Sequence, residues 1–220
     1  DTAIMGDIVA VSDNEVDLSV TVDAPCSVER IEVYDGRELV EIIRNYKSHS
    51  ADRRIRILME GAEHRGRGRI VKWDGRLIFK NNSVTCLKPI NFWNPEQQPE
   101  LTSDGSISFK AITTGNSVGF DVWLADERSG EIVFESNQTT FNIQLSDIIA
   151  EDYCVPIGEI GKQVRFYYLP DELKDCSLEI SRSIPVREKG DSRIYVKVFQ
   201  EDGHIAWSSP IYMFHKTNPE

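Results

Sequence analysis

The stretch that decides the fold is residues 194–213, which read IYVKVFQEDGHIAWSSPIYM. Apolar and other side chains alternate over its first half, which is the period of two of a β-strand. Asp202-Gly203 supplies the residue types that a tight hairpin turn needs. The return half carries Trp207, which we expect to anchor the core, and Pro210, which belongs outside a ladder because it has no backbone donor. The stretch therefore predicts a β-hairpin.

Two other Asp-Gly pairs stand between apolar runs in the same way. Asp35-Gly36 separates residues 28–34 from residues 38–43, which predicts a second hairpin. Asp74-Gly75 separates residues 70–73 from residues 76–79 and predicts a third by the same turn chemistry.

Alternation of apolar and polar side chains continues along the chain and predicts further strands at residues 16–22, 55–59, 107–111, 118–124, 132–134, 141–145, 164–168 and 176–180. The main helix signal is Ser146-Asp147, which can cap one short turn through Ile149. Short strands with frequent turn signals are typical of antiparallel sandwiches, so the expected class is an all-β, antiparallel β-sandwich.

Composition restricts the class of protein and of partner. The chain has 220 residues, 40% of them hydrophobic and 28% charged, which is ordinary for a soluble globular protein. The net charge of −11 argues against nucleic acid as the main partner, because a polyanion would be repelled. No apolar run is long enough to predict a membrane span. Because the chain begins at Asp1 without Met, we expect it to be a fragment or a processed form.

The residue types that usually carry chemistry are scattered. The four cysteines have no C-x-x-C spacing, so neither a zinc nor a redox motif is indicated, and buried thiols are favoured over two disulfides. The compartment stays open, with cytoplasmic favoured and periplasmic or secreted also possible. The histidines stand alone and Ser208-Ser209 lacks a G-x-S-x-G elbow, so no metal, cofactor or catalytic residue is predicted.

The main candidate for binding is a basic patch between Arg53 and Lys80, opposite in sign to the rest of the chain. Its centre is the tract Arg65-Gly66-Arg67-Gly68-Arg69. Guanidinium groups match phosphate and carboxylate geometry, so Arg65, Arg67 and Arg69 could hold an anionic ligand or dock an acidic surface. The alternative is a solvated or ion-paired strand face, with the two glycines marking a bulge or a close backbone approach.

Two tryptophans suggest a second kind of ligand. Trp73 and Trp123 adjoin Lys72 and Asp121, which indicates nearby solvent and a possible stacking platform for a sugar ring. The alternative is that both indoles are buried.

Residues 198–204 and 206–211, which read VFQEDGH and AWSSPI, resemble the C-terminus of a bacterial family of unassigned function that is related to PHP-type metal-dependent phosphoesterases. Shorter segments along the chain resemble the same β-rich region, among them residues 31–36, 65–69, 73–75 and 113–115. A PHP site needs clustered His, Asp and Glu, which this chain lacks. The resemblance implies that any catalysis lies outside this chain.

The resemblance also implies an architecture and a role. The opening strands would pair with the closing hairpin in an immunoglobulin-like sandwich of residues 1–50 and 162–220, with residues 51–161 inserted as a second β-domain. The chain would be a non-catalytic accessory region, without a cofactor, that packs on the catalytic N-terminal domain of the same parent chain. The alternative is a carbohydrate or surface-binding β-sandwich module.

Overall fold

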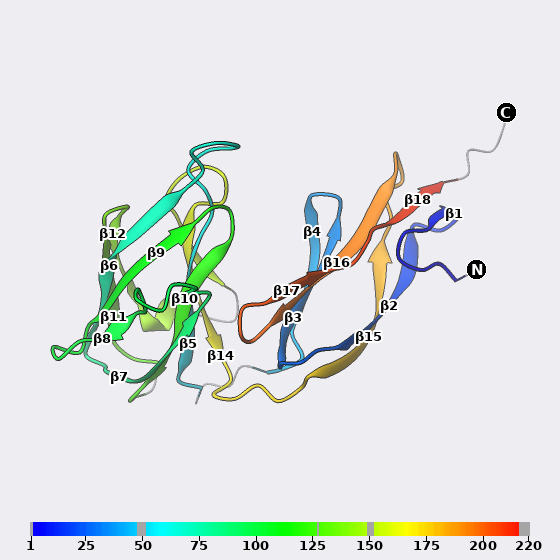
Figure 1. The fold of residues 1–220 in the computed structure, drawn as a ribbon. Helices are drawn as coiled ribbons and strands as arrows, with labels where there is room; N and C mark the ends of the chain where they lie inside the picture. The colour runs from blue at the N-terminus through cyan, green and yellow to red at the C-terminus, as the bar shows by residue number, and fades with distance from the viewer. Residues whose placement is uncertain (1, 48–51, 127, 149–151, 216–220) are drawn as a thin grey trace. The chain divides into compact units, whose positions relative to one another are not determined.

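The computed structural model describes residues 2–47, 52–126, 128–148 and 152–215, and the regular secondary structure of these residues is almost entirely β-strand. This confirms the predicted all-β, sandwich-like class with predominantly antiparallel sheets. The chain divides into two compact units, Asp1–Lys47 with Leu173–Glu220 and Ser48–Glu172. Figure 1 shows the strands of each unit.

The boundaries of these units differ from the predicted ones. The expected return to the first unit at residue 162 is wrong, because strand β14 (Gln163–Leu169) pairs with β5 (Arg54–Glu60) inside the second unit. The return lies at Leu173. The other boundary, expected near residue 50, falls within residues 48–51, which are outside the described residues.

The first unit is built from two sheets. The larger has the order β1 (Ile8–Val11), β18 (Ile211–His215), β16 (Ser192–Gln200), β3 (Val28–Asp35) and β4 (Glu38–Ile43), with β17 (Ile205–Trp207) also paired to β16. The smaller consists, among the described residues, of β2 (Glu15–Asp23) and β15 (Ser177–Pro185). Apolar side chains from both sheets, among them Ile31, Val33 and Ile184, form one core.

The closing hairpin is confirmed. β16 and β17 are antiparallel neighbours, and the turn between them contains Gly203 at a φ of 91°. Pro210 lies between β17 and β18, outside the ladder as expected. The hairpin formed by β3 and β4 around Asp35-Gly36 is confirmed as well.

The expected role of Trp207 is wrong. Lys197 lies directly opposite Trp207, so both side chains project from the same face of the sheet. The core contains Val196 on the other face of β16. The register therefore turns Trp207 away from the core, and 61% of it is exposed.

The second unit is a sandwich of two five-stranded sheets. The first sheet has the order β13 (Tyr153–Pro156), β14, β5, β10 (Ser117–Leu124) and β7 (Val84–Ile90). The second has the order β12 (Thr140–Gln144), β11 (Glu131–Ser136), β6 (Val71–Lys80), β9 (Ile107–Thr113) and β8 (Glu100–Leu101). Their facing side chains form the larger core, which includes Phe109, Phe120 and Phe166. The short helical turn is Leu145–Asp147, and Ile149, where we expected its end, lies outside the described residues.

The hairpin predicted at Asp74-Gly75 is wrong. β6 runs without a break through Gly75 and pairs on one side with β9 and on the other with β11. A Cβ at Gly75 would lie 2.1 Å from the carbonyl oxygen of Glu135. This glycine is therefore explained by close backbone approach within a sheet, and the dipeptide alone could not distinguish that from a turn.

Candidate binding groove

The first unit contains a groove of about 620 Å³. Each residue from Leu18 to Pro25 lines it, and so does each residue from Ala206 to Ser209. Neighbouring side chains on a strand point to opposite faces, so lining by consecutive residues means that the groove follows the edges of β2 and β17. Val196 and Val198 of β16 contribute apolar lining.

The edge of β2 that faces away from β15 has no strand paired with it among the described residues. At one end of the pair, Ala24 donates its amide to Cys176 O at 3.0 Å, and at the other Val186 donates to Asn14 O at 2.8 Å. Antiparallel ladders alternate bonded and non-bonded pairs, so even-numbered residues of β2 are the bonded ones. The residues that direct their backbone amide and carbonyl groups to the open edge are Asp17, Ser19, Thr21 and Asp23.

The same argument applies to β17. Gln200 donates to His204 O at 2.9 Å and Ser208 donates to Val196 O at 3.0 Å, so Ala206 forms the bonded pair between them. Ile205 and Trp207 therefore direct their backbone groups away from β16. Within the described residues no other strand pairs with β17. Two strand edges whose outward backbone groups pair with no described strand thus flank one groove.

The interior of the groove is apolar and incompletely covered. Leu18, Val20 and Val22 of β2 belong to the core but are only half-buried. At the groove, Ile4 and Met5 are 70% and 64% exposed. Apolar surface removed from water contributes roughly 25 cal/mol per Å², so an occupant that covered these side chains would be stabilised.

The opposite face of β2 is acidic. Glu15, Asp17 and Asp23 alternate with the apolar residues and are exposed. Glu15 accepts a hydrogen bond from the Ser183 hydroxyl at 2.8 Å and Asp23 accepts one from the Ser177 hydroxyl at 3.0 Å, both on β15. The open edge of β2 therefore carries negative charge beside its outward backbone groups.

The structure separates the two tryptophans predicted to form a platform. Trp73 is 1% exposed and donates its indole N–H to Thr113 Oγ1 at 3.0 Å inside the core of the second unit. Trp123 is half-buried, with the Arg54 guanidinium 4.8 Å from the centre of its ring. Trp73 is thus a core residue, and the pair cannot stack on a sugar.

The glycine-arginine tract lies in the loop between β5 and β6. Arg65, Arg67 and Arg69 are exposed, and Glu63 donates its amide to Arg69 O at 3.0 Å across the loop. Gly66 and Gly68 have φ angles of 81° and 79°, and a Cβ on either would meet nothing within 4 Å. The glycines therefore permit turns, and the expected bulge or close backbone approach is wrong.

Much of the remaining basic patch is ion-paired, as one of the two interpretations expected. Arg54 and Arg56 are buried, and both donate to Asp121, with Arg56 Nε 2.7 Å from Asp121 Oδ1 and Arg54 Nε 3.1 Å from Oδ2. Burial raises the pKa of Asp121, but the charges and hydrogen bonds of Arg56 and Arg54 outweigh it and hold the pKa below its ordinary value. On the surface, Arg76 pairs with Glu135 at 2.6 Å.

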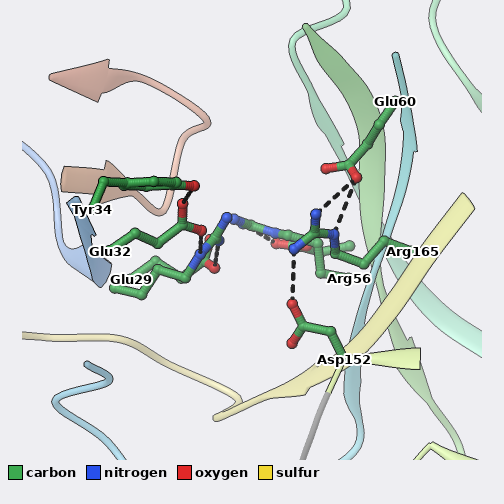
Figure 2. A network of polar contacts seen from close by, with 9 residues as sticks. Glu29, Glu32, Tyr34, Arg56, Glu60, Asp152 and Arg165 are labelled. Atoms are coloured by element: carbon green, nitrogen blue, oxygen red, sulfur yellow. Dashed lines mark hydrogen bonds and ion pairs between the residues drawn. The ribbon is translucent and has the colours of Figure 1, made fainter. Parts of the chain in front are cut away.

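Further polar side chains of both units take part in networks of hydrogen bonds and ion pairs, some of which Figure 2 shows. In the second unit, Arg165 lies between Glu60 and Asp152, at 3.0 Å from each carboxylate. Arg165 is thus ion-paired with two carboxylates of its own unit.

In the first unit, Arg30 donates to Glu29 and Glu32, and Glu32 also accepts from the Tyr34 hydroxyl at 2.7 Å (Figure 2). Burial and the Glu32 carboxylate raise the pKa of Tyr34, so the hydroxyl stays protonated and donates. These groups are held by one another, which favours a structural role.

Metal-ligating side chains do not gather anywhere in the described residues in groups of three. The cysteines are free thiols, as favoured, but their expected burial is wrong: Cys86 and Cys154 are exposed, while Cys26 and Cys176 are half-buried. Over the described part of the chain, no helix has the length and apolar character needed to cross a membrane.

The groove was not predicted from the sequence. The alternation at residues 16–22 did indicate a strand with one wet face, but the open edge depends on which strands pair with β2. No protein-family model matches the chain, and no curated protein or solved structure is similar enough to it to indicate a relative.

Proposed function

We propose that the chain is a non-catalytic binding region whose first unit receives an extended strand of another polypeptide along β2. The observation that carries the proposal is the row of outward amide and carbonyl groups at Ser19 and Thr21 beside an apolar groove. Main-chain hydrogen bonds to an exposed sheet edge provide affinity in this mode of recognition, and alternate side chains provide specificity.

The side chains of the groove indicate which sequence pattern a bound strand should have. Its inward side chains must be apolar at every second position, because Leu18 and Val20 project toward the core. Its outward side chains are best basic, because they would lie opposite Asp17 and Asp23, and opposite charges across a strand pair are favourable. The expected occupant is therefore an amphipathic strand that alternates apolar residues with Lys or Arg.

The sequence resemblance adds a proposal about the source of this strand. If the parent is a PHP-related hydrolase, the strand would come from its catalytic part, and this chain would act as the accessory region. That part of the proposal rests on the sequence resemblance, chiefly on the motifs in residues 198–211. The carbohydrate-binding alternative loses its main support, because Trp73 is buried.

One rung of the ladder provides a matched test. Ser19 and Ser181 lie opposite each other as a non-bonded pair, so their amides point to opposite edges of the same two-stranded sheet. Replacing either with proline removes an outward N–H without removing a bond between β2 and β15. Only Ser19 lies at the groove.

The probe is a fluorescently labelled peptide of alternating Val and Lys, with binding followed by anisotropy. Wild type and Ser181→Pro should bind it saturably, whereas Ser19→Pro should bind about tenfold more weakly or worse. Circular dichroism should show all three proteins folded. In wild type, the amide protons of Ser19 and Thr21 should exchange more slowly when the peptide is bound. Absence of binding, or equal weakening by both prolines, would contradict the proposal.

A further inference from the structure

A second cavity of the first unit, of about 570 Å³, lies at the turn between β3 and β4. Arg37, Arg187, Arg193 and Tyr195 line it. Arg193 and Tyr195 are odd-numbered residues of β16, so they project from the face opposite to the core residues Ile194 and Val196.

One of the three arginines, Arg187, is held in place by two carboxylates. Arg187 Nε donates to Asp35 Oδ2 at 2.7 Å and its Nη2 donates to Glu38 at 3.1 Å. Asp35 is buried and also accepts from the Ser192 hydroxyl at 3.1 Å and the Arg193 amide at 2.7 Å. Asp35 is thus fully used by the protein and fixes Arg187 at the wall of the cavity.

The other two arginines have no such partner. Arg37 and Arg193 are exposed, and among the described residues no carboxylate pairs with either guanidinium. Glu38 also lines the cavity, but its carboxylate is 77% exposed and already paired with Arg187. The cavity therefore keeps an excess of positive charge, although the chain as a whole carries a net charge of −11.

An aromatic wall completes the cavity. The Tyr195 ring stacks on Tyr34 with the ring centres 5.2 Å apart and the planes at 10°. This stack restricts the orientation of Tyr195 beside the arginines. A planar or apolar group attached to an anion would find a rigid surface there.

We infer that this cavity binds a compact dianion, either a phosphate monoester or a dicarboxylate, through Arg37 and Arg193 with Arg187 behind them. Guanidinium groups bind both kinds of anion through paired, charge-assisted hydrogen bonds. The cavity shares Tyr195 with the lining of the strand-binding groove, but its three arginines do not line that groove.

The chain offers a matched control for charge. Arg37→Gln with Arg193→Gln removes the two unpaired guanidinium groups from the cavity. Arg65→Gln with Arg67→Gln removes the same charge from the exposed loop of the second unit. All four side chains are exposed, so both double variants should fold.

The probes are phenyl phosphate and succinate, titrated into the protein at constant ionic strength while amide NMR shifts are recorded. At least one probe should shift the amides of Gly36 and Tyr195 saturably. The Arg37→Gln, Arg193→Gln variant should bind it about tenfold more weakly or worse, while the Arg65→Gln, Arg67→Gln variant should bind as wild type does. Absence of saturable shifts for both probes, or equal weakening in both variants, would overturn the inference.

The relative affinity at neutral pH, where both probes are dianions, then distinguishes the two kinds of anion. A phosphate monoester loses its second negative charge near pH 6, so its affinity should fall between pH 7 and about pH 5. Succinate also loses its second negative charge within this range, because the first ionised carboxylate raises the pKa of the other carboxyl group, so either probe should bind more weakly in mild acid. A site for phosphate should prefer phenyl phosphate at neutral pH. A site for dicarboxylates should prefer succinate at that pH.

Discussion

Lys197 of β16 and Trp207 of β17 lie directly opposite each other, and the Lys197 ammonium lies 6.0 Å from the centre of the indole ring. The same ammonium lies 4.2 Å from the ring centre of Tyr34 on the neighbouring strand β3. Contacts of this kind are worth about 0.5–1 kcal/mol at exposed sites. The pairing places Trp207 beside the groove and outside the core.

The two tryptophans Trp73 and Trp207 should therefore differ sharply in their effect on stability. Trp73→Ala should lower the free energy of unfolding by about 3–5 kcal/mol, because it leaves a cavity in the core and removes the indole N–H that donates to the Thr113 hydroxyl. Trp207→Ala should change it by less than about 1 kcal/mol. Urea unfolding monitored by circular dichroism measures both, and similar losses for the two variants would show that their environments are wrongly assigned.

Gly75→Ala should destabilise the second unit by about 2 kcal/mol, because the new Cβ would meet the Glu135 carbonyl and force β6 and β11 apart. Gly66→Ala is the control, since its Cβ would enter open space and only the positive φ of 81° is strained. That strain costs about 1 kcal/mol. Thermal unfolding should rank Gly75→Ala clearly below Gly66→Ala, and the reverse order would contradict the position of Gly75 within a strand.

Asp121→Asn should be strongly destabilising. The change leaves Arg54 and Arg56 buried without their shared carboxylate, and removing one partner of a buried ion pair typically costs about 3–5 kcal/mol. Asp126→Asn provides a control at an exposed carboxylate two residues beyond β10 and should change stability by less than about 0.5 kcal/mol. Denaturant titration of both variants at neutral pH is the measurement.

The same carboxylate predicts a dependence on pH. The pKa of Asp121 is lower in the folded protein than its ordinary value of 3.8, so the unfolded chain binds the proton more readily. Its contribution is therefore complete above the unfolded pKa and is lost as the pH falls through the folded pKa. The difference in unfolding free energy between wild type and Asp121→Asn should be constant above about pH 5 and shrink in stronger acid. A difference that grows as the pH falls would contradict the direction of this shift.

The candidate site was less predictable than the fold. Arginines in the basic patch were visible in the sequence, but their carboxylate partner, Asp121, lies on a strand more than sixty positions away. Among the cavity arginines, Arg37 is likewise distant in the chain from Arg187 and Arg193, so no motif links the three. The sequence also did not show that Arg65 lies in a loop, because this depends on β5 ending at Glu60 and β6 beginning at Val71.

What the sequence by itself determined is the local alternation and the turns. The period of two and the pairs Asp35-Gly36 and Asp202-Gly203 were sufficient for most of the strands, though not for β1, β7, β8 and β13, and for two hairpins, because both depend on neighbours within a few residues. The tertiary structure alone decided that Gly75 lies within a strand, that Trp207 faces away from the core and that β2 has an open edge. Each of these depends on which distant strands pair and in which register, and strand register is not encoded in the alternation of a single strand.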